Sequence, residues 1–147
     1  MTKPADRTLG SLIAEVPGAR LVRGSPDTVV QALEYDSRQA KQGSLFIAVP
    51  GFVTDGHTYL PQVAAAGAAA AIVQADHVDS LLVLPETLAL VSVPATRPAQ
   101  ASAAAWFYGH PGREMVVIGV TGTDGKTTTS HLLTSVLEAA GGRVGRL

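Results

Sequence analysis

A glycine-rich stretch near the end of the sequence holds the residue types with the clearest capacity for chemistry. An unbroken apolar run over 115–120 leads into a turn that closes on Gly125-Lys126-Thr127, and apolar residues at helical spacing follow it. Gly122 and Gly125 let backbone N–H groups turn inward, while a helix N-terminus adds a partial positive charge. Lys126 can reach the outer phosphates of a nucleotide, and the Thr127 hydroxyl can join a magnesium shell. The stretch therefore predicts a phosphate-binding loop.

The spacing of this loop departs from the general consensus. Val120 stands five positions before Gly125, where a glycine is usual. The alternative is an ordinary strand–turn–helix with a surface lysine, but the order of strand, glycine loop, lysine and helix favours nucleotide binding. The residues predicted to bind ATP are Gly122, Thr123, Asp124, Gly125, Lys126, Thr127 and Thr128. Lys126 is also the one catalytic residue predicted, through phosphate positioning, and Thr127 is the predicted magnesium ligand.

The elements that must position such residues alternate along the chain. Short apolar strands are expected over 19–23, 29–35, 44–49, 69–73, 81–84, 88–93 and 116–120, with another opening at 143–147. Helices are expected over 9–16, 59–66 and 95–108 and after the phosphate loop. Gly67 has the position of a left-handed helix cap. This alternation predicts an α/β fold with a mainly parallel sheet.

Composition excludes several classes of function. The chain has 147 residues, no cysteine, a net charge of −1 and 46% hydrophobic residues. Near-zero charge gives no electrostatic case for nucleic acid or an anionic membrane, and the lack of cysteine excludes disulfides and thiolate metal sites. The N-terminal ten residues have no apolar core, so we expect no signal peptide. No apolar stretch is long enough for a bilayer-spanning helix, which predicts a cytoplasmic protein.

A domain boundary is expected at the turn Gly109-His110-Pro111-Gly112. Residues 1–110 then form one small domain, and 111–147 begin a second. One strand and one helix cannot bury the apolar residues of that second part by themselves. We therefore expect an N-terminal piece of a longer enzyme, inactive alone.

Two motifs in the right order make the chain resemble the Mur ligases, the ATP-dependent amide-forming enzymes of peptidoglycan precursor synthesis. One motif is the phosphate loop Gly119–Thr129, whose spacing in that family also departs from the consensus. The other combines Asp36-Ser-Arg38, Gly43-Ser-Leu-Phe46, Gly51 and Asp55-Gly-His57 with Ala64…Gly67-Ala68, and it is similar to the domain that binds the UDP-sugar. The segment Trp106–Pro111 also looks like this family. Together the motifs span almost the whole chain.

The resemblance implies a set of ligands and a mechanism. It implies ATP and Mg²⁺ as cofactors, small-molecule partners (UDP-MurNAc-dipeptide and an amino acid), no nucleic acid or membrane partner, and a monomer at full length. ATP would convert the substrate carboxylate to an acyl phosphate, which the incoming amine attacks. The residues implied to bind the UDP-sugar are Tyr35, Ser37, Arg38, Phe52, Val53, Thr54, Asp55, Gly56 and His57.

The branch of the family is the next question. Gly-Thr-Asp-Gly-Lys-Thr-Thr-Thr followed by Ser130-His131 looks most like the MurE type, which adds meso-diaminopimelate or L-lysine as the third peptide residue. The MurF type is the alternative. Asp124 stands where the family usually has asparagine, and its carboxylate would oppose phosphate binding unless it faces away or helps hold magnesium. Two other possibilities are a non-catalytic module for a nucleotide-sugar and a generic nucleotide hydrolase or kinase.

Structural roles compete with function at several polar residues. Ser37 and Arg38 can instead belong to a turn in which Arg38 pairs with Asp36. Asp55 can cap the helix that follows it. No carboxylate or histidine with metal-ligand spacing surrounds His57 in the sequence, so a structural or substrate-contact role is expected there. His131 is expected to pack on a helix surface, and His77 and His110 carry no signal.

Overall fold

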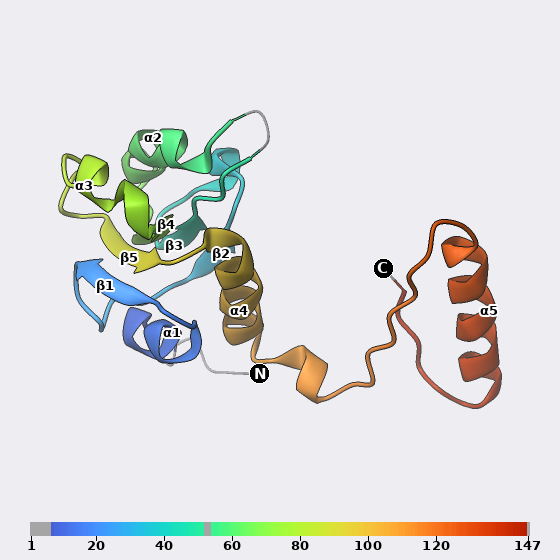
Figure 1. Ribbon diagram of the computed structural model, residues 1–147. Coiled ribbons are helices and arrows are strands. Elements are labelled where there is room, and N and C mark those ends of the chain that lie inside the picture. Colours follow the sequence, from blue (N-terminus) through green and yellow to red (C-terminus); the bar gives the residue numbers. More distant parts are fainter. Residues whose placement is uncertain (1–6, 52–53, 147) are drawn as a thin grey trace. The chain divides into compact units, whose positions relative to one another are not determined.

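Alternating apolar segments build a five-stranded sheet in the computed structural model, which describes residues 7–51 and 54–146. The strands are β1 (Arg20–Arg23), β2 (Ala32–Glu34), β3 (Ser44–Ile47), β4 (Ala70–Gln74) and β5 (Ala89–Val93), in the spatial order β1-β5-β4-β3-β2. β2 to β5 are parallel, whereas β1 pairs antiparallel with β5 at one edge (Figure 1). The predicted fold class, α/β with a mainly parallel sheet, is confirmed.

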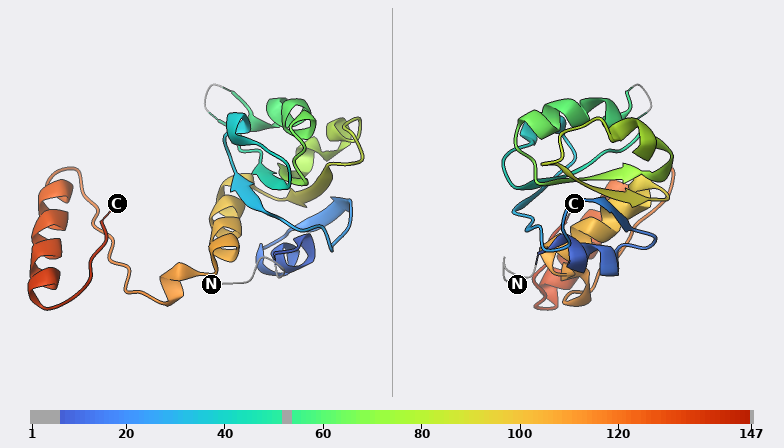
Figure 2. Two further views of the ribbon diagram at one scale, coloured as in Figure 1. Left: turned by 180° about the vertical axis from the view of Figure 1, so that it is seen from behind. Right: turned by 90° about the vertical axis from the view of Figure 1, so that its left-hand side faces the viewer.

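Two layers of helix cover the sheet, because successive strand residues point to opposite faces. On one face α1 (Leu9–Glu15) and α4 (Thr96–Tyr108) pack on Leu45, Ile47 and neighbouring side chains. On the other face α2 (Leu60–Ala65) and α3 (Val78–Leu81) pack on Phe46 and its neighbours. Figure 2 shows the sheet between these two layers. All residues of both cores lie in the first of two units, Met1–Pro111 and Gly112–Leu147.

Glycine ends three helices in the same way. At the end of α2 the N–H of Gly67 donates to Ala64 and that of Ala68 to Val63, the hydrogen-bond pair of the Schellman motif. Gly109 and Gly141 take the corresponding positions after α4 and α5 (Lys126–Ala139). All three glycines have positive φ, so the predicted cap at Gly67 is confirmed. No helix among the described residues is long and apolar enough to span a membrane.

The predicted strand over 81–84 is wrong. The segment that follows β4 is a 3-10 turn, η4 (Ala75–His77), and then the short helix α3. Leu81 and Leu84 are buried whereas Leu82 and Val83 between them are exposed, so the apolar pattern has a helical spacing of three. The carbonyl oxygens of this segment accept from the Arg23 guanidinium instead of from a neighbouring strand.

The strand predicted at 116–120 is also wrong in the described structure. This run is extended but belongs to no sheet, and the described part of the predicted strand over 143–147 has no regular structure. Val116 and Val117 are 88% and 72% exposed. A strand requires hydrogen-bonded neighbours, and no described segment pairs with this run. The helix predicted after the loop is confirmed as α5.

Candidate functional site

The segments that carry the predicted sugar-site residues meet at one edge of the sheet. Because β2 to β5 are parallel, their C-terminal ends lie side by side, which is where open α/β sheets bind ligands. The 3-10 turn η2 (Ser37–Gln39) follows β2, Asp55 and η3 (Gly56–Tyr59) follow β3, and η4 follows β4. The N-terminus of α4 follows β5, and its Arg97 donates to the carbonyl of Pro50 at 2.9 Å.

The Asp36-Ser37-Arg38 turn is held by its own first and last residues. A carboxylate oxygen of Asp36 accepts the backbone N–H of Arg38 at 3.0 Å, and the Arg38 guanidinium donates to both oxygens at 2.7–3.2 Å. These bonds lower the pKa of Asp36 to about 2. The structural alternative, pairing of Arg38 with Asp36, is therefore confirmed. Tyr35 is 72% exposed and Ser37 is half-buried beside it, and their contact with a ligand stays a prediction.

The Asp55-Gly56-His57 turn forms the base of the second predicted sugar-binding segment. Asp55 accepts the backbone N–H of His57 at 2.9 Å, so the predicted capping role is confirmed. A Cβ on Gly56 would lie 2.7 Å from the backbone nitrogen of Val49, which leaves room for glycine alone. Thr54 is exposed at the other side of the turn. Phe52 and Val53, predicted at the tip, lie outside the described residues.

His57 lies in a more crowded polar environment than the sequence indicates. Its ring is 4% exposed, Nδ1 is 2.6 Å from a carboxylate oxygen of Asp55, and Nε2 accepts the backbone N–H of Gln74 at 2.9 Å. The His77 ring stacks on it with centroids 4.0 Å apart. The sequence offers His57 no partner with metal-ligand spacing, whereas the structure brings one ligand atom each of Asp55, His57 and His77 within 4.8 Å of one another. Sequence reasoning gave His77 no role, because only the pairing of β3 with β4 brings it to the His57 ring.

The segment predicted to form the phosphate loop turns at two glycines before α5. Gly122 and Gly125 have φ of 153° and 75°, and Gly125 precedes α5 without any side-chain cap on the helix N–H groups. The Lys126 ammonium group donates to the carbonyl oxygens of Gly122 and Thr123 at 2.5 and 3.1 Å. Asp124 and Thr127 are exposed. Open helix N–H groups, a nearby lysine and a free-standing threonine hydroxyl are a donor set that fits a magnesium nucleotide.

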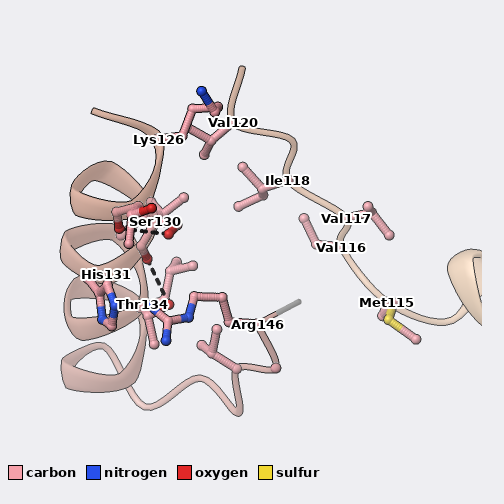
Figure 3. A pocket seen from close by; sticks show the side chains of 15 residues that line it. Met115, Val116, Val117, Ile118, Val120, Lys126, Ser130, His131, Thr134 and Arg146 are labelled. Carbon is pink, nitrogen blue, oxygen red and sulfur yellow. Dashed lines mark hydrogen bonds between the residues drawn. The ribbon is translucent and has the colours of Figure 1, made fainter. Parts of the chain in front are cut away.

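An open hollow of about 730 Å³ lies beside this loop within the second unit. It is bounded by the extended run 115–120 on one side and α5 on the other, and Figure 3 shows Val116 and Ile118 on the side that faces the helix. His131 lines it among mostly aliphatic side chains. Polar side chains also line the hollow, among them Lys126, Thr127 and Arg146.

A family model described as "Mur ligase family, catalytic domain" matches residues 29–120 of the sequence. The chain belongs to the Mur ligase family. The match covers both turns of the sheet edge and ends just before the phosphate loop. The predicted resemblance is confirmed at the level of the family.

Named Mur ligases resemble the chain beyond that segment. The UDP-N-acetylmuramyl-tripeptide synthetase of Roseiflexus sp. (strain RS-1) is 47% identical over 79% of this chain and 22% of its own length. The UDP-N-acetylmuramoyl-L-alanyl-D-glutamate–2,6-diaminopimelate ligase of Geobacillus thermodenitrificans (strain NG80-2) is 41% identical over 93% of this chain and 26% of its own. A match of that extent necessarily includes the phosphate loop. This chain spans about a quarter of the length of these relatives.

A solved Mur ligase structure has the same fold. Crystal structure II of MurF from Acinetobacter baumannii aligns with a TM-score of 0.65 and 29% identity, over 93% of this chain and 28% of that one. The sequence relatives and the solved structure carry names from different branches of the family.

Proposed function

We propose that the chain is the N-terminal part of an ATP-dependent ligase that adds the third amino acid, meso-diaminopimelate or L-lysine, to UDP-MurNAc-L-Ala-D-Glu. The observation that carries this proposal is the 41% identity to a diaminopimelate ligase over 93% of the chain. That extent takes in the sheet-edge turns and the phosphate loop together. Chance similarity of one loop does not explain both motifs in order.

In this proposal the first unit holds the nucleotide-sugar at the C-terminal edge of its sheet. The exposed ring of Tyr35 offers an aromatic face to a uracil, and the Ser37 hydroxyl offers a donor and an acceptor beside it. The Arg38 side chain is 81% exposed and brings positive charge toward a diphosphate while Asp36 fixes its direction. Asp36 and Asp55 carry negative charge, but each already accepts hydrogen bonds inside its own turn.

The second unit contributes the nucleotide loop. Bound Mg-ATP would supply the phosphoryl group that activates the substrate carboxylate as an acyl phosphate. Lys126 would exchange its two carbonyl partners for phosphate oxygens, which are stronger acceptors for an ammonium group. Thr127, in the first turn of α5, would hold the magnesium ion through its hydroxyl group. Localisation in the cytoplasm belongs to the same proposal, since the precursors of this ligase family are nucleotide-activated.

The main alternative is a MurF-type ligase, and one observation favours it: three solved structures that align with the chain, all from Acinetobacter baumannii, carry names of that type at 28–29% identity. Sequence relatives at 36–47% identity instead carry the names of tripeptide synthetases and diaminopimelate ligases. The higher identity favours the third-residue branch. A non-catalytic module that binds a nucleotide-sugar would account for the first unit. Such a module would not require a lysine followed by a threonine, Lys126 and Thr127, at the end of the glycine loop.

Calorimetric titration with UDP-MurNAc-L-Ala-D-Glu tests the proposal. We expect saturable binding by this chain, and binding at least about tenfold weaker for Ser37→Ala because a polar contact to the nucleotide is lost. Ser135→Ala is the matched control, since its hydroxyl bonds only within α5. Absence of binding by a folded chain, or an unchanged affinity of Ser37→Ala, contradicts the proposed site.

An assay of ligation then distinguishes a MurE-type from a MurF-type ligase. The protein at the full length of its relatives is assayed with meso-diaminopimelate, L-lysine and D-alanyl-D-alanine, each with the matching UDP-sugar peptide. We expect phosphate release with one of the first two amino acids. Turnover with D-alanyl-D-alanine alone identifies the MurF-type alternative.

A further inference from the structure

His77 is a residue to which neither the sequence pattern nor the proposed function gives a role. It ends η4, directly after β4, and both of its ring nitrogens face carboxylates. Nε2 lies 3.1 Å from an oxygen of Asp55, and Nδ1 lies 2.8 Å from an oxygen of Asp76. Its ring is stacked on that of His57, at an interplanar angle of 12°. We call Asp55, His57 and His77 the histidine clamp.

The hydrogen bonds of His57 fix its tautomer. Its Nε2 receives the backbone N–H of Gln74, so this nitrogen carries no proton. Its Nδ1 lies 2.6 Å from Asp55, and a carboxylate can only accept, so Nδ1 carries the single proton. His57 is therefore a neutral ring fully engaged with protein atoms. Asp55 is left with one oxygen for His77.

The same reasoning makes His77 an imidazolium. Each of its nitrogens must carry a proton to donate to a carboxylate, and both face one. The bond to Asp76 raises the pKa of His77 above its ordinary 6.5, as do the charges of Asp55 and Asp76, against a smaller opposing effect of burial. Burial by itself would raise the pKa of Asp55, but the bonds from His57 outweigh it and lower that pKa. Among the described residues, the titratable groups in contact with this ring are Asp55, which caps η3, His57 within η3, and Asp76 beside His77 in η4.

A metal site is the competing interpretation of the clamp. One ligand atom from each of the three residues lies within 4.8 Å of the others. However, the two rings are nearly parallel, so an ion in the plane of one ring lies out of the plane of the other. Binding through Nδ1 of His57 would also place a proton on Nε2, opposite the N–H of Gln74. The geometry fits hydrogen bonding better than coordination.

Asp55 connects the clamp to the loop that precedes it. Asp55 forms an isolated bridge with Pro50, and the N–H of Gly51 donates to the carbonyl of Thr54 at 3.0 Å, which closes the loop at its base. We propose that His77 is a positioning residue: as an imidazolium shared by Asp55 and Asp76, it fastens the base of this loop to the end of β4 for binding of the nucleotide-sugar. This inference rests on the proposed function only for the identity of the ligand.

The clamp has a defined pH window. Because the pKa of His77 is raised, the stabilisation that charged His77 gives the clamp is complete below pH 6.5. It is lost as the pH rises through the higher pKa that His77 has in the folded protein. Because the pKa of Asp55 is lowered, the stabilisation that its carboxylate gives the clamp is complete above pH 3.8. It is lost as the pH falls through the lower pKa that Asp55 has in the folded protein. The clamp is therefore intact in mildly acidic solution and weakens in alkaline solution.

The first test follows the His77 ring by NMR. We expect its titration midpoint above 6.5, with Asp55→Asn moving it down and Asp27→Asn, in an exposed turn elsewhere, leaving it in place. A midpoint at or below 6.5 overturns the proposal. So does saturable perturbation of both clamp rings by Zn²⁺ at about 100 μM, which would identify a metal site.

The second test measures the affinity of the protein for the nucleotide-sugar. Affinity for UDP-MurNAc-L-Ala-D-Glu should fall about threefold to tenfold between about pH 6 and about pH 8.5, the effect of one lost charge-assisted bond. His77→Gln should bind weakly at both pH values, and His77→Arg, which keeps the charge, should bind well at both. Binding that depends on Ser37 but not on pH or His77 overturns the clamp and leaves the proposed function standing. If no ligand binds, the proposed function fails, and the NMR midpoint still decides the clamp.

Discussion

Lys126, the residue proposed to contact the phosphates of ATP, is held by backbone carbonyls of the preceding loop. Its ammonium group donates to two carbonyl oxygens of its own loop, Gly122 and Thr123, while the N–H groups at the start of α5 have no side-chain cap. Carbonyls are weaker partners for a cation than phosphate oxygens are. The lysine is thus held close to the place where a nucleotide would need it.

At this scale we predict that Lys126→Met weakens binding of Mg-ATP at least tenfold, or about 1.4 kcal/mol, since one charge-assisted contact is lost. Lys126→Arg should retain part of the affinity, because it keeps the charge but changes the donor geometry. Titration of a fluorescent ATP analogue measures both. Lys41→Met, a surface substitution in the first unit, is the control. Equal affinities for wild type and Lys126→Met contradict the phosphate-loop assignment.

At the scale of elements, the sheet is connected by turns whose glycines have distinct physical reasons. Gly67 has φ of 81°, but a Cβ there meets nothing closer than 3.5 Å. Gly24 has φ of 104°, and a Cβ there would lie 2.5 Å from the side chain of Ala89 in β5. The first position needs glycine for conformation alone, and the second needs it for conformation and for space.

This difference predicts a graded loss of stability. Gly67→Ala should lower the free energy of unfolding by about 1 to 2 kcal/mol, the cost of a left-handed residue with a Cβ. Gly24→Ala should cost more, because overpacking of β1 against β5 is added. Urea denaturation followed by circular dichroism measures both, with Gly112→Ala as the control in open space. A smaller effect at Gly24 than at Gly67 would show that the contact with Ala89 relaxes freely.

At the scale of the whole molecule, the first unit contains both described cores, and the second exposes much of its apolar surface. The exposed set consists of Met115, Val116, Val117, Ile118, Leu132 and Val136, all at least 52% exposed. Exposed apolar patches of this kind promote association. Within the described part of the second unit, these side chains are therefore not buried as a core strand and a core helix face would be.

We predict that residues 1–111 fold without the second unit. Because its core residues all lie within 9–107, its melting temperature should match that of the whole chain to within about 2 °C. Self-association should decrease at the same time, since the exposed apolar set is removed. Calorimetry and sedimentation velocity measure the two effects. A large drop in melting temperature would show that the second unit contributes to the first core.

Local patterns in the sequence were enough for most of the helices and strands. Helical spacing identified α1, α4 and α5, continuous apolar runs identified β3 to β5, and Gly67 marked a helix end, because each depends on neighbouring residues. The turns at Asp36 and Asp55 could also be read locally, since each carboxylate bonds a residue two positions away.

The tertiary structure decided what depends on distant partners. The run at 116–120 has the composition of a buried strand, yet it forms none because no described segment pairs with it. Leu81 to Leu84 became helix and turn where Arg23 could bond their carbonyls. His77 reached Asp55 only through the parallel register of β3 and β4, which no local pattern encodes. Contacts between residues far apart in sequence follow from the pairing of strands, and that pairing is a property of the whole sheet.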